Sequence, residues 1–428
     1  MKVRYLGILM SLFLGFSVLI AQSRDDDKTT NLQRLVEVDQ CVACHIDEEV
    51  LPEGLHENDI HLRVGLSCAG CHGGDPTSDD MDIAMDPARG YVGIPDKRDL
   101  PRFCGKCHSD INFMRQFRPQ VETDQEEQYY TSRHGILLLK GDTKVAVCTD
   151  CHTSHAVFPA SDPRSSVYAT NVPETCKRCH SDADFMAEYK IPTDQYDKYA
   201  ESVHGMALLK KKDVGAPACN DCHGNHGALP PGVTSIGQVC GNCHINNLQY
   251  FQKTKMAEEF KKMDLHDCIE CHGYHEVPPT NDDMVGVGEQ STCIDCHDEG
   301  DAGYKAAVKI RQLLMDLTTT IDSAKVLKKR VQIIGMDDLD IEYLLKDAHQ
   351  QLIHARTVVH TFDPEQVEEK TKTGLERARE AIQLAWQEIK EHHQRRRGFL
   401  FATLFTTLLI IGLFIKLRQI EAEQKDVS

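Results

Sequence analysis

The pattern of hydrophobic and polar residues differs from one part of this chain to another. Between 302 and 397, apolar residues recur at helical spacing within long runs of helix-forming residues. Gly335 interrupts the first predicted helix, Asp337 can cap the second, and Asp363 followed by Pro364 begins the third. This region therefore predicts three packed helices.

Two uninterrupted apolar runs flank the rest of the chain. The run at 6–20 follows Lys2 and Arg4 and precedes Ala21, a pattern typical of a secretory signal, with an uncleaved anchor as the other interpretation. The run at 398–415 carries no charge and forms about 27 Å of helix, enough to cross the hydrocarbon of a bilayer. The two runs predict an exported chain with a C-terminal membrane anchor.

The segment between 41 and 297 shows neither the helical spacing of apolar residues nor a long apolar run. The whole chain of 428 residues has 14 Phe, 12 Tyr and one Trp, which are few large apolar groups for several ordinary cores. We therefore expect another group to fill the interior of this segment.

Cysteine supplies the strongest pattern in the segment. All 18 cysteines form nine C-x-x-C pairs, and histidine follows the second cysteine every time. The nine motifs are Cys41, Cys44, His45; Cys68, Cys71, His72; Cys104, Cys107, His108; Cys148, Cys151, His152; Cys176, Cys179, His180; Cys219, Cys222, His223; Cys240, Cys243, His244; Cys268, Cys271, His272; and Cys293, Cys296, His297.

The histidine distinguishes among the sites that paired cysteines can form. A zinc ribbon needs no histidine next to its second thiolate, a disulfide framework needs none at all, and a thioredoxin-like site would occur once. C-x-x-C-H is the attachment pattern of c-type haem, in which the thiols bind the porphyrin and the histidine is the proximal iron ligand. The sequence predicts nine covalent haems, too closely spaced for separate pockets, so the haems must pack together.

Internal repeats organise the motifs. Similar stretches begin at Cys104, Cys176 and Cys240, at periods of 72 and 64 residues. Each repeat holds a leading histidine, a first motif that is often extended to C-H-x-x-H, and a second motif. The predicted haem pairs start at Cys68 and Cys104, Cys148 and Cys176, Cys219 and Cys240, and Cys268 and Cys293, and the haem at Cys41 stands outside the array.

Spare histidines at equivalent repeat positions are the candidate distal ligands. In the first repeat Asp75 replaces the histidine of the extension, and His56 could substitute for it. One more iron lacks a candidate within the array and could use a histidine of the helical region, a methionine, or no ligand. The candidates are the leading His61, His134, His204 and His266, the extending His155, His226 and His275, and His56, His354 and His360.

These motifs resemble those of multihaem c-type cytochromes. The two-haem repeat is similar to that of periplasmic decahaem electron-conduit cytochromes and tetrahaem quinol dehydrogenases. This resemblance implies low-spin, low-potential irons stacked closely enough for electron hopping. The order of haem array, helical bundle and anchor also resembles the hydroxylamine oxidoreductase family, from which the chain departs in motif number. The C-x-x-C-K site of related nitrite reductases is absent.

Two functions compete on this reading. Two axial histidines leave an iron no open position, which favours an electron carrier between a quinol-oxidising or cytochrome b membrane subunit and periplasmic cytochromes or a terminal reductase. The alternative is an oxidoreductase acting on a small nitrogen or sulfur oxyanion at one five-coordinate haem, for which the haem at Cys41 is the natural candidate. A net charge of −18 favours basic partners and disfavours nucleic acid.

The predicted fold is mainly α, with little regular structure around a stacked haem array, a C-terminal helical bundle and one transmembrane helix. We expect the chain on the periplasmic side of a bacterial cytoplasmic membrane, with the lipid bilayer holding its C-terminal helix. The expected segments are a signal at 1–22, a nonahaem domain at 23–300, a helical stalk at 301–397, a membrane helix at 398–416 and a cytoplasmic tail at 417–428.

Overall fold

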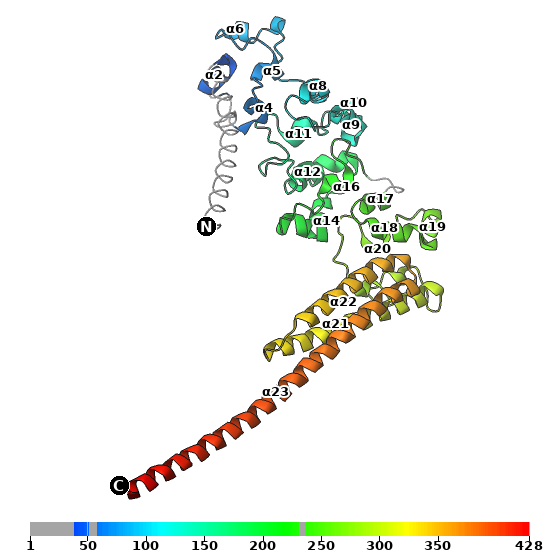
Figure 1. Cartoon of the computed structure of the whole chain (residues 1–428). Coiled ribbons are helices and arrows are strands. Elements are labelled where there is room, and N and C mark those ends of the chain that lie inside the picture. The colour runs from blue at the N-terminus through cyan, green and yellow to red at the C-terminus, as the bar shows by residue number, and fades with distance from the viewer. Residues whose placement is uncertain (1–37, 49, 51–57, 231–235, 428) are drawn as a thin grey trace. The chain divides into compact units, whose positions relative to one another are not determined.

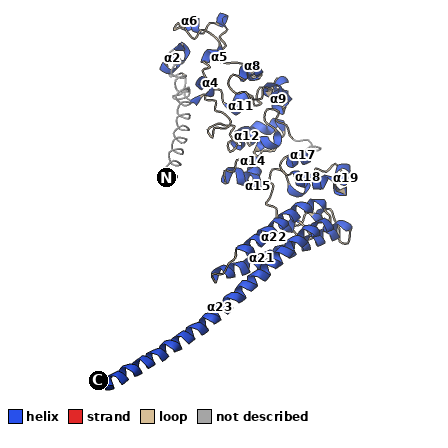
Figure 2. Ribbon diagram, in the orientation of Figure 1, coloured by secondary structure: helices blue, strands red, loops and turns tan. Residues whose placement is uncertain are grey.

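The computed structural model describes residues 38–48, 50, 58–230 and 236–427. The predicted signal at 1–22 and His56 lie outside the described residues. Regular structure in the described part is helical, without a strand, which confirms the predicted fold class (Figures 1 and 2). The chain divides into two compact units. The N-terminal unit comprises the described residues of Met1–Gly232 with Gly273–Pro278, and the C-terminal unit those of Val233–His272 with Pro279–Ser428.

Short helices joined by turns make up the N-terminal unit. They are α2 (Gln40–Asp47), α4 (Ile60–Arg63), α5 (Cys68–His72), α6 (Met81–Ala84), η1 (Pro87–Arg89), α7 (Leu100–His108), α8 (Ile111–Met114), α9 (Gln125–Thr131), α10 (Arg133–Leu139), α11 (Cys148–His152), α12 (Val172–His180), α13 (Ala183–Met186), η2 (Ala187–Tyr189), α14 (Gln195–Glu201), α15 (Val203–Gly205), the π-helical turn η3 (Met206–Lys210) and α16 (Cys219–His223).

The C-terminal unit combines short helices with three long ones. The short elements are α17 (Ile236–Gly241), α18 (Ile245–Gln252), α19 (Lys255–Lys262), α20 (Ile269–His272), η5 (Asp282–Met284), η6 (Cys293–Asp295) and η7 (Val359–Thr361). The long helices are α21 (Ala302–Ile333), α22 (Leu339–Val358) and α23 (Pro364–Val427), which pack side by side as the predicted bundle (Figure 1).

Apolar side chains on facing stripes hold the three long helices together. Leu317 of α21, Ile341 of α22 and Ala378 of α23 are each 0% exposed. The predicted breaks are confirmed, because Gly335 adopts a φ of 71° after α21 and Asp363 Oδ1 accepts a hydrogen bond from Glu365 N (2.9 Å) at the start of α23. This bundle supplies a continuous hydrophobic core, whereas the described part of the cysteine-rich segment has only small clusters such as that of Tyr129, Leu138 and Val147.

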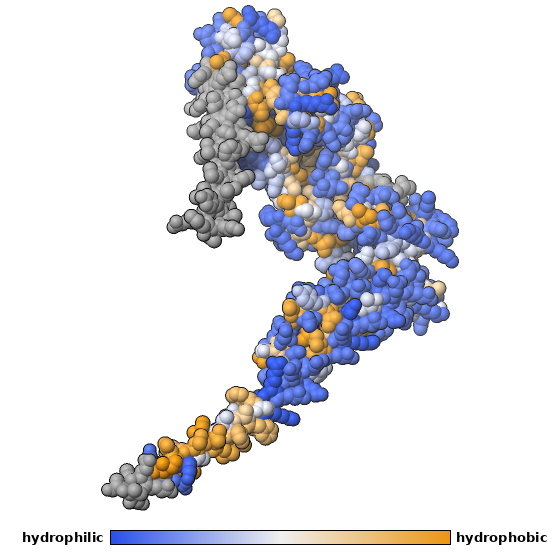
Figure 3. Space-filling model, viewed as in Figure 1, coloured by the Kyte–Doolittle hydropathy of each residue, from blue (hydrophilic) through white to orange (hydrophobic). Residues whose placement is uncertain are grey.

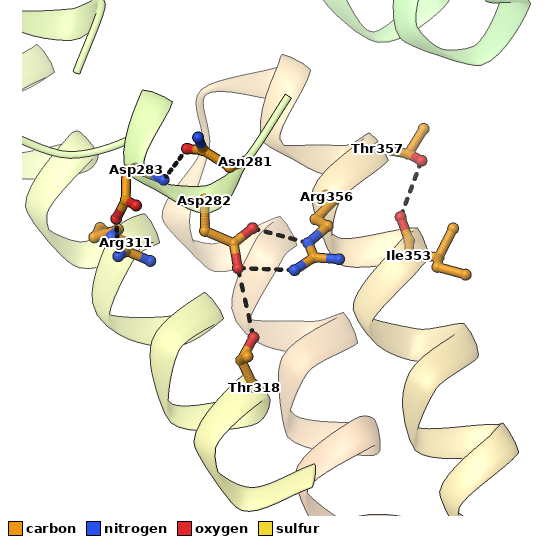
Figure 4. A network of polar contacts seen from close by, with 8 residues as sticks. All are labelled: Asn281, Asp282, Asp283, Arg311, Thr318, Ile353, Arg356 and Thr357. Carbon is orange, nitrogen blue, oxygen red and sulfur yellow. Dashed lines mark hydrogen bonds and ion pairs between the residues drawn. The ribbon is translucent and has the colours of Figure 1, made fainter. Parts of the chain in front are cut away.

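A polar clamp joins the turn η5 to the bundle (Figure 4). Asp282 accepts two hydrogen bonds from Arg356 of α22, at 2.8 Å from Nε and 2.9 Å from Nη2, and a third from Thr318 Oγ1 of α21 at 3.5 Å. Its neighbour Asp283 forms an ion pair with Arg311 of α21. The clamp fixes the segment that leads into the last cysteine motif.

Helix α23 continues beyond the bundle as a single exposed helix, red at its end in Figure 1. Its most apolar 18-residue window has a mean hydropathy of 2.4, and none of that window is buried. Phe399, Phe401 and Phe405 are 68–75% exposed. Figure 3 shows the resulting hydrophobic band beyond the polar bundle. Length and composition make this segment a candidate membrane span.

Candidate haem-binding site

The nine cysteine motifs lie on or beside short helices. All eighteen cysteines belong to the described part, and none forms a disulfide, so the structure gives no support to a disulfide framework. In α5, α11 and α16 the motif fills the whole helix, from its first cysteine to its proximal histidine. The helix ends there because the next residue has a positive φ, 68° at both Gly73 and Thr153 and 83° at Gly224. Each thiol pair and its histidine are therefore held on a single helical turn.

Local hydrogen bonds fix where two of these motif helices begin. Tyr129 Oη donates to the carbonyl of Ala146 (2.9 Å), two residues before Cys148. Tyr199 Oη donates in the same way to Pro217 (2.8 Å), two residues before Cys219. The repeated contact gives the two motif helices the same support.

Thiols of consecutive motifs lie close together. Hydrogen bonds join the first cysteines Cys104 and Cys148, Cys176 and Cys219, and Cys240 and Cys268. Burial raises the pKa of Cys151 to about 11, and the nearby thiol of Cys176, from the next motif, adds to this effect. The thiol of Cys107 likewise adds to the raised pKa of Cys71, and that of Cys293 to the raised pKa of Cys271. Groups bound to neighbouring motifs would therefore meet edge to edge within each unit.

Among the described residues, apart from the sequence neighbours His392 and His393 in α23, histidine rings come together in six pairs at nearly constant separation. The ring centres are 6.0 Å apart in His61 and His108, 6.2 Å in His72 and His155, 6.1 Å in His134 and His180, 6.1 Å in His152 and His226, 5.9 Å in His223 and His275, and 6.1 Å in His272 and His360.

This separation fits a haem iron between the two rings. An iron bound by two imidazole nitrogens at about 2 Å each holds the ring centres roughly 6 Å apart. Each pair joins the histidine of a C-x-x-C-H motif to a histidine outside any motif. Packed rings can also lie this far apart, so it is the pairing of a motif histidine with a spare histidine, repeated six times, that shows that the residues present fit covalent haem. When bound, haem supplies one-electron redox chemistry.

The pairs follow the repeat. A leading histidine faces the second motif of its own repeat, as His134 faces His180. An extending histidine faces the first motif of the preceding repeat, as His226 faces His152. His360, from the helical region, takes the extending role for the last repeat and faces His272. Sequence spacing suggested the two sets of spare histidines, but it did not indicate which motif each one faces.

A backbone hydrogen bond ties the two kinds of spare histidine together. The residue before a leading histidine donates its N–H to the carbonyl two residues after an extending histidine. The three bonds are Ile60 N to Val157 O (2.9 Å), Arg133 N to Ala228 O (3.0 Å) and Val203 N to Val277 O (3.0 Å). No residue type is required for such a bond, so the sequence carries no signal for it.

The Nδ1 atoms of three proximal histidines have partners. His72 Nδ1 lies 3.0 Å from Val92 O, His223 Nδ1 3.2 Å from Leu229 O, and His297 Nδ1 3.2 Å from Asp301 Oδ2. These contacts leave Nε2 as the nitrogen that can bind iron, and they fix the ring orientation.

Burial keeps several of the paired rings neutral. It lowers the pKa of His152 to about 4, with His226 and His108 adding a smaller electrostatic effect. Burial likewise lowers the pKa of His134 and of His360. Neutral imidazole is the form that binds a metal, so these rings are ready to act as ligands near neutral pH.

The remaining predicted residues lie in other settings. His204 occupies the second position of α15, matching His134 in α10. His266 contacts its own neighbour, with Nδ1 3.1 Å from Glu270 Oε1. His354 is exposed on α22 and contacts Gln350. His45 is half-buried on α2, and His244 immediately precedes α18.

Comparison with known proteins agrees with this chemistry. Residues 60–181 match the family model described as cytochrome c3, and residues 18–73 and 239–317 match cytochrome c554 and c-prime. No curated protein and no solved structure matches the chain significantly. Two cytochrome families thus cover different stretches of one repeated attachment pattern, and the chain is a multihaem c-type cytochrome.

Proposed function

We propose that this cytochrome carries nine covalent haems and conducts electrons along them. The six histidine pairs, with ring centres 5.9–6.2 Å apart, are the observation that carries this proposal. An iron held between two such rings has no open position, so it exchanges electrons without binding substrate. The assigned roles are proximal ligation by the nine motif histidines and distal ligation by His61, His134, His155, His226, His275 and His360.

Within each unit, the order of the haems along the electron path would be the order of the motifs. Within each unit the thiols of consecutive motifs are close enough to influence one another, as Cys104 and Cys148 do. Haem edges attached there would be near neighbours, and each electron step would be short. We assign the path within each unit to run through its motifs in sequence.

The partners follow from the proposed anchor. The exposed apolar end of α23 would lie in a lipid bilayer and hold the haems on its periplasmic side. The donor would be a quinol-oxidising or cytochrome b subunit in that membrane, and the acceptors periplasmic cytochromes or a terminal reductase. The net charge of −18 would steer basic surfaces of these partners toward the chain.

The ligand assignment is tested by comparing two histidines of the same helical region. His360→Ala should convert one haem per chain from low spin to high spin, because His272 loses its partner ring at 6.1 Å. His354→Ala should leave the spectrum unchanged, since that side chain is exposed. Electron paramagnetic resonance of the purified, membrane-extracted chain measures both, and its intact mass counts the haems.

A predominantly high-spin wild-type protein would refute the electron-conduit function. Equal spectra of the His360→Ala and wild-type proteins would refute the assignment of His360. If His360→Ala does not accumulate, His226→Ala tests the same rule at His152 in the other unit.

A second candidate function is reduction or oxidation of a small nitrogen or sulfur oxyanion at the haem of Cys41. The specific observation is Asp75, which stands where the later repeats place an extending histidine. By the repeat rule that position would serve the haem of the preceding motif, and Gln40 N donates to Pro76 O (2.8 Å), which ties this loop to α2.

Asp75 is itself engaged by other groups. Its carboxylate accepts from Thr77 Oγ1 (2.6 Å) and from Arg89 Nη1 (2.7 Å). Arg89 would provide a cation for an anionic ligand beside an open iron. Cyanide titration should then convert one high-spin haem to low spin, whereas a chain whose haems are all low spin before cyanide would exclude this function.

A further inference from the structure

Four helices present their second residue from the same capped turn. The N-cap residues Asp59, Ser132, Ser202 and Thr254 all have extended backbone, with φ between −68° and −92° and ψ between 128° and 164°. Their second helical residues are His61, His134, His204 and Met256. Three of the four are the leading histidines of their repeats, and the fourth is a methionine.

The hydrogen bonds of the turn place Met256 at the equivalent position, although Ala257 stands where the other two turns have Gly135 and Gly205. Ser132 Oγ donates to Tyr129 O (2.6 Å) and accepts from Gly135 N (2.9 Å). Thr254 Oγ1 repeats both bonds, donating to Phe251 O (2.7 Å) and accepting from Ala257 N (3.1 Å).

Ser202 forms the same two bonds, with Tyr199 O (2.6 Å) and Gly205 N (3.0 Å). The aromatic residue three positions before each cap is retained in all three turns. Local structure thus places Met256, and not His266, at the leading position of the fourth repeat.

Two of the leading histidines, His61 and His134, pair with the ring of a motif histidine. His61 faces His108 at 6.0 Å, and His134 faces His180 at 6.1 Å, each pair linking a leading residue to the second motif of its own repeat. The second motif of the fourth repeat ends at His297. Asp301 holds the Nδ1 of His297 at 3.2 Å, which leaves Nε2 for iron.

We propose that the thioether sulfur of Met256 is the distal ligand of the ninth haem, opposite His297. This inference rests on the proposed electron-conduit function and refines it. Methionine opposite histidine raises the reduction potential of a haem relative to two histidines. The ninth haem would then have a higher reduction potential than the haems held by two histidines.

The test uses the full-length, haem-loaded chain. Wild-type protein should show the near-infrared charge-transfer band of ferric iron bound to methionine, at an intensity of one haem per chain. Met256→His should abolish the band, keep the ninth haem low spin and lower its potential in a redox titration. Met256→Ala should abolish the band and give one high-spin haem.

Met263→Ala is the matched control, because Met263 is 58% exposed at the end of the same helix. It should keep the band and all potentials. A wild-type protein without the band, or a band that survives Met256→Ala, would overturn the proposal. So would a high-spin haem that appears in His266→Ala and not in Met256→Ala. None of these results alters the six histidine pairs, so the conduit function is judged separately by their low-spin signals.

Discussion

Gly135 follows a leading histidine and leaves no room for a side chain. A Cβ at this position would lie 2.1 Å from the carbonyl oxygen of Tyr129, and one at Gly205 would lie 1.9 Å from that of Tyr199. The close approach brings His134 and His204 tightly against the preceding helix. The glycine of the S-x-H-G pattern is therefore required by packing, in addition to any role of the histidine.

We expect Gly135→Ala to destabilise the N-terminal unit by about 1–3 kcal/mol, because the added methyl group must displace backbone. The haem between His134 and His180 should also gain high-spin character. Heat denaturation followed by circular dichroism measures the first effect and electron paramagnetic resonance the second. Gly70→Ala is the control, since its nearest neighbour would be Leu66 Cδ2 at 4.0 Å. Equal melting of both variants would contradict this account.

At the residue scale, the sequence identified chemistry better than geometry. The motif predicts each proximal histidine because its role depends only on neighbours in the chain. It cannot separate His354 from His360, since which one reaches His272 depends on how α22 ends. Spacing does not point to the proposed ligand Met256, because it follows His244 by 12 residues, whereas His134 and His204 follow their motif histidines by 26 and 24. His266, at 22 residues, matches that spacing, and its prediction as the leading residue follows from it.

At the scale of elements, the Asp282 clamp controls how the last motif is held. Arg356→Ala removes two charge-assisted hydrogen bonds from a carboxylate that is only 13% exposed. We expect a loss of about 1 kcal/mol, reduced from the buried value because Arg356 itself is 45% exposed. The melting temperature of the C-terminal unit should fall accordingly.

Arg395→Ala provides the comparison for this prediction. Arg395 pairs with Glu391 at 2.7 Å on the exposed face of α23, with side chains 68% and 41% exposed. Exposed pairs contribute little, so its melting curve should coincide with that of the wild type. If both variants melt alike, the clamp adds no stability beyond that of a surface ion pair.

Long helices could be predicted from the sequence, and short ones could not. The breaks at Gly335 and Asp363 and the helical period between them define α21, α22 and α23. A motif helix such as α11 has five residues, too few to show any period. Its position depends on contacts such as that of Tyr129 with Ala146, which come from distant parts of the sequence.

At the scale of the whole molecule, the proposed anchor gives the clearest prediction. Wild-type chain should remain with membranes through washes with high salt and alkaline carbonate, because a run of 18 uncharged, mainly apolar residues leaves hydrocarbon only with detergent. A chain ending at Arg397 should appear in the soluble fraction with the same haem content. Sedimentation with absorbance measures both, and a truncated chain that still pellets would contradict the anchor.

Flanking charge and haem attachment favour opposite orientations of the proposed anchor. Arg395, Arg396 and Arg397 precede the apolar segment, and Lys416 and Arg418 follow it. Charge alone would favour the arginine side facing the cytoplasm, whereas haem attachment requires that side to be exported.

The sequence is enough to predict that the chain consists of a haem region, a helical bundle and an apolar helix. The division into two packing units cannot be predicted in this way, because it depends on which motifs touch.

The length of helix α23 also sets the distance between the proposed bilayer and the haems at the far end of the bundle. Pro364 begins it beside the haem-ligand candidate His360, and it continues unbroken to the apolar segment after Arg397. At 1.5 Å per residue, that stretch spans roughly 50 Å. A quinone dissolved in the proposed bilayer would lie far outside tunnelling range of the haems at the other end of the bundle. A membrane donor that reduces these haems directly must therefore carry redox centres of its own along this helix.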